Sequence, residues 1–228
     1  MSKTLIEWGG QTLELHQSGA LYWPAQKTLV LSDLHFEKGS NFLIRRLFLP
    51  PYDTAETLNR VETVMAHFKP ERIILLGDVF HDAKAWQRMS SENKTWFEKL
   101  LGGPQVIWVE GNHDAGSTRD FVDSHTLEGL SFRHIATVSD FEISGHYHPA
   151  AAIRHKGTLV RAPCFVVNAR QIIMPSFGAY TGGLDITEEA MAPFLKDDTR
   201  LFLLGQEKEY EAPIEKLDND SLSFRTFR

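Results

Sequence analysis

The sequence predicts an α/β fold whose second half is rich in β-strands. Short unbroken apolar runs at residues 28–31, 73–76 and 106–109 have the length of strands buried on both faces. A stretch with helical periodicity separates the first two runs, and this strand–helix–strand order favours parallel strands. From residue 157 onward short apolar runs follow one another, and the candidate strands are residues 158–160, 164–167, 171–174, 184–187 and 201–204. We expect one domain over residues 1–205 and a polar C-terminal tail over residues 206–228.

Two helices are predicted in the first half, after short strands within residues 11–31. Residues 53–68 carry apolar side chains at helical spacing, and Asp53 with Glu56 has the spacing of a capping box. A second helix over residues 90–101 begins at one of two serines and ends at a pair of glycines. Residues 38–51, which precede the first helix, are expected to form a loop that contains several cations.

Composition limits the class of protein. The chain has 228 residues, 24 Lys and Arg, 30 Asp and Glu, and a net charge of −6. This charge excludes the overall positive field of a non-specific nucleic-acid binder, although it leaves room for a nucleic-acid substrate at one local site. The single cysteine, Cys164, excludes an internal disulfide and favours a reducing compartment. Because no apolar run has the length of a signal peptide or a membrane span, we expect a cytoplasmic protein without membrane contact.

Metal-ligating side chains follow directly after five predicted strands. The carboxyl ends of strands are where open α/β sheets bind ligands. Each motif also has an ordinary explanation, such as a Gly-Asp turn, an Asx turn or a hydrogen-bonded Asp–His pair. A single histidine at a strand end, such as His134, is more often structural. The ligand set consists of Asp33 and His35, Asp78, Asn112, His134, and His146 with His148.

One ion cannot use seven ligands, but two ions can if one carboxylate bridges them. Asp78 is the best candidate for the bridge because it leaves the central strand and lies between the other ligands in chain order. Mixed nitrogen and oxygen ligands without thiolates suit Mn²⁺, Fe or Zn²⁺ at a reactive site rather than a structural zinc site.

The joint pattern resembles the calcineurin-like metallophosphoesterases. The motifs in order are Asp33-x-His35, Gly77-Asp78-x-x-His81, Gly111-Asn112-His113-Asp114, a middle histidine, and Gly145-His146-x-His148. The resemblance spans residues 28–149. Finer features are similar to a bacterial subfamily, the ligase-associated DNA-damage-response endonucleases, and they are residues 31–39, 49–54, 132–134 and 177–183.

The resemblance implies a four-layer α/β/β/α sandwich of two mixed sheets and a pair of divalent ions, most simply Mn²⁺, with Fe or Zn²⁺ as alternatives. One ion is then held by Asp33, His35, Asp78 and His148, and the other by Asp78, Asn112, His134 and His146. The implied reaction is metal-assisted hydrolysis of a phosphoester. His113 would protonate the leaving oxygen, and Asp114 would orient His113.

Substrate contacts are predicted for four further residues. Many family members have a second Asp where this chain has His81, so the role of His81 is open. The cations of residues 38–51 could contact phosphate, and the glycine-rich loop at residues 175–183 could present an aromatic face. The candidate substrate-binding residues are His81, Lys38, Arg45 and Tyr180.

The leading functional hypothesis is a phosphodiesterase or nuclease that acts on nucleic acid or nucleotides. The subfamily resemblance implies a role in DNA repair and DNA ligase or other repair proteins as partners, by association only. A phosphomonoesterase for a small metabolite or a phosphoprotein is the first alternative. A non-catalytic metal-binding scaffold in a repair complex is the second. The sequence does not predict the oligomeric state.

Overall fold

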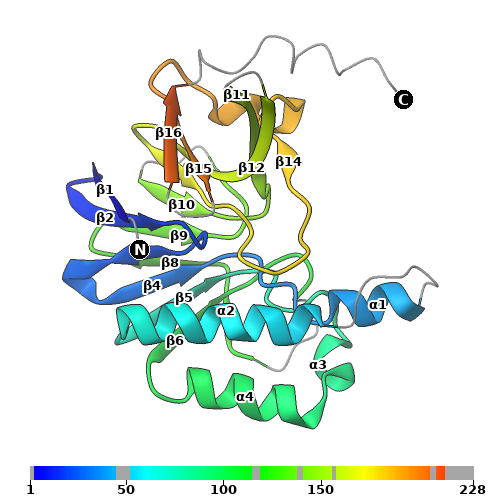
Figure 1. Cartoon of the computed structure of the whole chain (residues 1–228). Coiled ribbons are helices and arrows are strands. Elements are labelled where there is room, and N and C mark those ends of the chain that lie inside the picture. Colours follow the sequence, from blue (N-terminus) through cyan, green and yellow to red (C-terminus); the bar gives the residue numbers. More distant parts are fainter. Residues whose placement is uncertain are drawn as a thin grey trace.

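Two β-sheets packed face to face, with helices on the outside, make up the chain (Figure 1). The structure, a computed structural model, describes residues 3–44, 52–114, 119–137, 141–155, 158–205 and 209–213. The predicted α/β class and the sandwich of two mixed sheets are confirmed.

The first sheet has seven strands in the order β1-β2-β3-β4-β5-β6-β7. Neighbours from β1 to β4 pair antiparallel, whereas β4 to β7 pair parallel. The strands are β1 Lys3–Trp8, β2 Gln11–His16, β3 Leu21–Trp23, β4 Thr28–Leu31, β5 Arg72–Leu76, β6 Gln105–Val109 and β7 Phe121–Val122. The three apolar runs of the sequence are therefore the parallel strands β4, β5 and β6. Strands β4 and β5 are buried as expected, whereas β6 is half-buried over most of its length.

The second sheet runs in the order β14-β11-β12-β13-β10-β9-β8, and β15 pairs with both β12 and β16. Its strands β9, β10 and β13 are parallel to one another. The strands are β8 Ser124–Leu127, β9 Leu130–Arg133, β10 Glu142–Ser144, β11 Pro149–His155, β12 Thr158–Val167, β13 Gln171–Ile173, β14 Leu184–Asp185, β15 Arg200–Leu204 and β16 Glu209–Pro213. Strand β16 lies in the segment assigned to a polar tail, and residues 214–228 are outside the described part of the chain.

Alternation of side chains along the strands builds the core layers. In β5, Ile74 and Leu76 lie between the two sheets, whereas Ile73 and Leu75 pack against the helices. The helices α2 and α4 cover that outer face (Figure 1). On the outer face of the second sheet lies the short 3₁₀ helix η2. The helical elements are η1 Pro24–Gln26, α1 Lys38–Ile44, α2 Asp53–Phe68, α3 Ala85–Arg88, α4 Ser91–Leu101 and η2 Glu189–Phe194.

Both predicted helices are present, but one of them does not begin with the predicted cap. Ser90 caps α4 because its hydroxyl accepts the backbone N–H of Asn93 at 3.2 Å. Asp53 does not cap α2. The N-cap is Tyr52, and the Asp53 carboxylate instead accepts the backbone N–H of Gly39 at 2.8 Å. The predicted loop over residues 38–51 is also wrong in its first part, which forms α1.

Within the described residues, no helix is long and apolar enough to cross a membrane.

Candidate active site

Five loops meet at one edge of the sandwich, and they carry the predicted metal ligands. The parallel strands β4, β5 and β6 end at this edge, as do β9 and β10 of the second sheet. The loops after β4 and β5 continue side by side, because the His35 N–H donates to the Asp78 carbonyl at 2.9 Å. The side chains delivered there are Asp33 and His35 after β4, Asp78 after β5, Asn112 after β6, His134 after β9, and His146 and His148 after β10.

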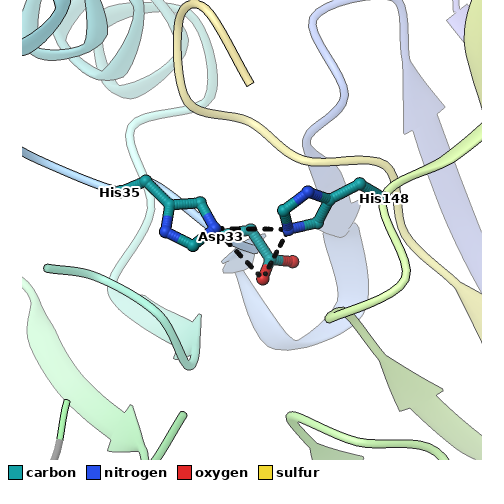
Figure 2. Close-up of side chains that lie close together, drawn as sticks. All are labelled: Asp33, His35 and His148. Atoms are coloured by element: carbon teal, nitrogen blue, oxygen red, sulfur yellow. Dashed lines mark hydrogen bonds and ion pairs between the residues drawn. The ribbon is translucent and has the colours of Figure 1, made fainter. Parts of the chain in front are cut away.

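One group of three converging side chains consists of Asp33, His35 and His148 (Figure 2). Asp33 is fully buried, and its Oδ1 lies 3.0 Å from the His148 Nε2 and 4.0 Å from the His35 Nε2. The two imidazole Nε2 atoms face each other at 3.3 Å. These three atoms from distant parts of the chain thus lie close enough together to share one metal ion.

A second group contains Asp78, His134 and His146. The His134 Nε2 lies 3.5 Å from the Asp78 Oδ2, 3.1 Å from the His146 Nδ1 and 3.0 Å from the Asn112 Oδ1. Asn112 therefore joins this group through its amide oxygen.

Asp78 lies between the two groups. Its Oδ2 is 3.8 Å from the His35 Nε2 of the first group and 3.5 Å from the His134 Nε2 of the second. Its Oδ1 accepts the backbone N–H of His113 at 2.9 Å, which holds the carboxylate in place. The bridging role that chain order indicated for Asp78 stays a prediction.

Backbone carbonyls orient two of the imidazoles. The Nδ1 of His134 lies 2.9 Å from the Leu76 carbonyl oxygen, and the Nδ1 of His148 lies 3.2 Å from that of Gly182. An imidazole that donates from Nδ1 to a carbonyl keeps its Nε2 lone pair for a metal. The Asp33 Oδ2 is held in turn by the Ser32 hydroxyl and, at 3.0 Å, by the His146 backbone N–H.

The electrostatics of the site favour cations. Burial opposes ionisation of Asp33, but His148 and two further imidazoles together lower the pKa of this carboxyl to about 2. Burial also opposes the charged form of His134, yet the carboxylates of Asp78 and Asp33 raise the pKa of this imidazole to about 9. Burial lowers the pKa of His35 to about 3, so this imidazole is neutral and offers a lone pair.

The residues fit a pair of divalent ions. Two neutral imidazole nitrogens that face each other at 3.3 Å repel each other through their lone pairs unless a proton or a cation lies between them. Between His134 and His146, whose nearest ring nitrogens are 3.1 Å apart, the raised pKa of His134 indicates a proton, and a divalent ion would take its place. Each group supplies a carboxylate and two imidazoles without thiolate, a set that suits Mn²⁺, Fe or Zn²⁺.

Left-handed backbone conformations recur at these loops. Five of the predicted ligands have positive φ, a region that costs an L-residue about 1–2 kcal/mol, and they are Asp33 at +54°, His35 at +47°, Asp78 at +48°, His146 at +69° and His148 at +47°. Strain of this kind clusters at functional sites, where the surrounding structure enforces it. Sequence reasoning did not find it, because such conformations are normally signalled by Gly or Asn rather than by Asp or His.

His113 lies beside the metal ligands, but its partners differ from those expected. Its Nε2 is 3.8 Å from the Asp78 Oδ2, and its ring stacks on His81 at a centroid distance of 5.5 Å. The Asp114 carboxylate accepts backbone N–H groups of Val79, Phe80 and Gly111. No hydrogen bond joins it to the His113 imidazole within the described residues. Asp114 therefore joins the loops after β5 and β6 through their backbone, and its role toward His113 stays a prediction.

The other predicted substrate contacts are only partly placed. Lys38 is half-buried at the start of α1. Burial lowers the pKa values of His35 and His81, and the positive charge of Lys38 adds a smaller contribution in the same direction, so Lys38 lies near the site. Tyr180 is 52% exposed in the loop that contains Gly182. Arg45 lies outside the described residues.

A family profile and two solved structures are similar to this chain. The profile of the calcineurin-like phosphoesterase family matches residues 26–198. A crystal structure of the nuclease MPE from Pseudomonas putida is similar, with a TM-score of 0.72 and 28% identity, over 92% of this chain and 100% of that one. A second solved structure is YfcE, a phosphoesterase from E. coli, with a TM-score of 0.41 and 14% identity, over 82% of this chain and 98% of that one. No curated protein matches in a sequence search.

The fold and the ligand set define a phosphoesterase of the dinuclear type. Because the family profile covers more than half of the chain, the chain belongs to the calcineurin-like phosphoesterases. It is thus a metal-dependent phosphoester hydrolase with two candidate metal sites.

Proposed function

We propose that this protein is a Mn²⁺-dependent phosphodiesterase that cleaves nucleic acid. The observation that carries the proposal is the pair of carboxylate–imidazole groups joined by Asp78, with His113 beside them. The similarity to a nuclease supports nucleic acid as the substrate. A role in DNA repair, and DNA ligase as a partner, stay predictions from the subfamily resemblance.

Asp33, His35 and His148 would hold one ion, and Asn112, His134 and His146 the other, with Asp78 between them. When bound, such ions neutralise the phosphate and lower the pKa of a coordinated water toward neutrality. The remaining chemistry belongs to the chain. The His113 Nε2 lies 3.8 Å from the Asp78 Oδ2. From there it would donate a proton to the leaving oxygen of a phosphodiester bound at the two ions.

His81 and Lys38 would support this step. The parallel stacking of the His81 and His113 rings, with an interplanar angle of 14°, limits rotation of the acid. Lys38 supplies a positive charge at the rim of the site for a non-bridging phosphate oxygen. This local charge would offset the net negative charge of the chain.

The test is a Mn²⁺ titration of metal-free protein with matched substrates. We expect turnover of bis(p-nitrophenyl) phosphate and of an oligodeoxynucleotide, and little turnover of p-nitrophenyl phosphate. Asp78→Asn should abolish turnover and lower the number of Mn²⁺ ions bound. Asp123→Asn, which makes the same charge change at an exposed position, is the control. Cleavage of the monoester alone would show that the protein is a phosphomonoesterase instead. Two bound ions without turnover of any substrate would favour a non-catalytic metal-binding scaffold.

A further inference from the structure

We infer that Tyr180 is a specificity-determining residue whose ring stacks on a nucleobase next to the scissile phosphodiester. The inference rests on the proposed function and names the part of the substrate that is recognised. It starts from the loop between β13 and β14, whose backbone pairs with residues that directly follow β4 (Figure 1).

This loop is anchored directly to the candidate metal centre. The Ser176 hydroxyl and the Gly178 N–H both donate to the carbonyl of Asp33, at 2.8 and 3.1 Å. The Gly182 carbonyl accepts the Nδ1–H of His148 at 3.2 Å. Tyr180 lies midway between Gly178 and Gly182. Because consecutive Cα atoms are about 3.8 Å apart, its Cα is within about 8 Å of the Cα atoms of both anchor residues.

The loop is also tied to α2 and to the core. The Ala179 N–H donates to the Thr57 hydroxyl at 2.9 Å, and Phe177 is fully buried with the Arg60 guanidinium 4.9 Å from its ring centroid. With both flanks held, the backbone that carries the Tyr180 ring is pre-organised. A ring on a fixed backbone loses little entropy when it binds a flat ligand.

Tyr180 itself is exposed and strained. The residue is 52% exposed, and its φ of +57° is a conformation that a glycine or asparagine would adopt at lower cost. Neither fold stability nor solubility favours a large aromatic residue at such a position. An exposed aromatic face beside a phosphate site is, however, what a base-stacking residue requires.

The charge of the protein makes such a contact useful. At a net charge of −6 the chain gains little affinity for a polyanion from its overall field. Stacking does not depend on charge and tolerates any base, because every base has a π-face. A base bound in this way must be unstacked from one neighbour, and its sugar links it directly to the phosphate at the metal centre.

The test compares a thymidine oligonucleotide with an oligomer of abasic sugar phosphates of the same length. Tyr180→Ala should lower kcat/KM for the thymidine oligomer by about five- to 150-fold, the range that stacking on one base supplies. Tyr180→Ala should change kcat/KM for the abasic oligomer by less than twofold. Tyr180→Phe should keep the wild-type kcat/KM for both oligomers. Fluorescence anisotropy with metal-free protein should show the same pattern in Kd.

Phe141→Ala is the matched control. Phe141 is also exposed, at 40%, and also has a positive φ, +52°, but it precedes β10 at the end of the sheet opposite to the site. Phe141→Ala should leave kcat/KM for both oligomers unchanged. Equal losses on the two oligomers with Tyr180→Ala, or a loss below twofold on the thymidine oligomer, would overturn this inference alone. Failure of the wild-type protein to cleave either oligomer would refute the proposed function and, with it, the inference.

Discussion

Gly145→Ala tests how closely the two sheets must approach to form the metal centre. Gly145 follows β10, and a methyl group at its Cα would lie 2.5 Å from the Asp33 Oδ2 and would overlap the Ser32 hydroxyl more severely. Ordinary van der Waals contact begins at 3.4 Å, so the carboxylate oxygen must move by about 0.9 Å. That oxygen already accepts the His146 N–H, so the displacement affects ligands of both groups.

A displacement of about 1 Å at a reacting centre costs on the order of 100-fold in rate. We therefore expect Gly145→Ala to lower kcat/KM for bis(p-nitrophenyl) phosphate by about 100-fold, equivalent to about 2.7 kcal/mol of transition-state stabilisation. Binding of Mn²⁺, followed by isothermal titration calorimetry, should weaken in parallel. The assay is initial-rate kinetics across a Mn²⁺ series, with the unfolding temperature measured on the same samples.

Two further variants test whether the loss comes from the predicted steric overlap. Gly103→Ala is the matched control, because nothing lies within 4 Å of a methyl group at that position. Adding Ser32→Ala to Gly145→Ala removes the hydroxyl that the methyl overlaps, so the double variant should recover part of the lost activity. Turnover of Gly145→Ala within threefold of wild type, at an unchanged unfolding temperature, would refute the reasoning.

The remaining predictions concern the acid, a buried carboxylate and a buried histidine. His113→Ala should keep Mn²⁺ binding but lower kcat, most for an oligonucleotide and least for p-nitrophenyl esters, whose leaving group needs no proton; equal losses on both would remove His113 from the acid role. Asp114→Asn should lower the free energy of unfolding by about 1–3 kcal/mol, measured in urea, because an amide cannot accept three backbone N–H groups; an unchanged midpoint would contradict the assigned contacts. Burial, followed by repulsion from His67, lowers the pKa of His16 from 6.5 to about 4. The folded protein then binds fewer protons than the unfolded chain between these values, so stability should fall by up to about 3 kcal/mol as the pH drops from 6.5 to 4. His16→Gln should flatten this part of the pH profile, and an equally steep profile in the variant would show that other groups cause it.

Several features of the site followed from the sequence because they depend on local pattern. The apolar runs before Asp33 and Asp78 encode strands that are buried on both faces, and the run before Asn112 encodes a strand that is half-buried over most of its length. The helix between the first two runs makes those strands parallel, which brings their carboxyl ends to one edge. The presence of several metal ligands at a common edge could therefore be predicted without coordinates.

The grouping of those ligands could not be predicted from the residues alone. His35 and His148 are 113 positions apart, and they meet only because the two sheets pack over one shared core. The carbonyls of Leu76 and Gly182 that orient two imidazoles leave no trace in the sequence, because every residue has a carbonyl. The same holds for the left-handed backbone at Asp33 and the other ligands.

Asp114 shows most clearly that the sequence alone does not predict the hydrogen-bond partners of a side chain. The family resemblance implied that Asp114 would orient the neighbouring His113. The folded chain turns this carboxylate toward the backbone of the β5 loop instead. Sequence determined which chemical groups are available and on which strand ends they lie. Tertiary structure decided which groups face one another, because contacts between distant segments depend on sheet packing and backbone strain rather than on local pattern.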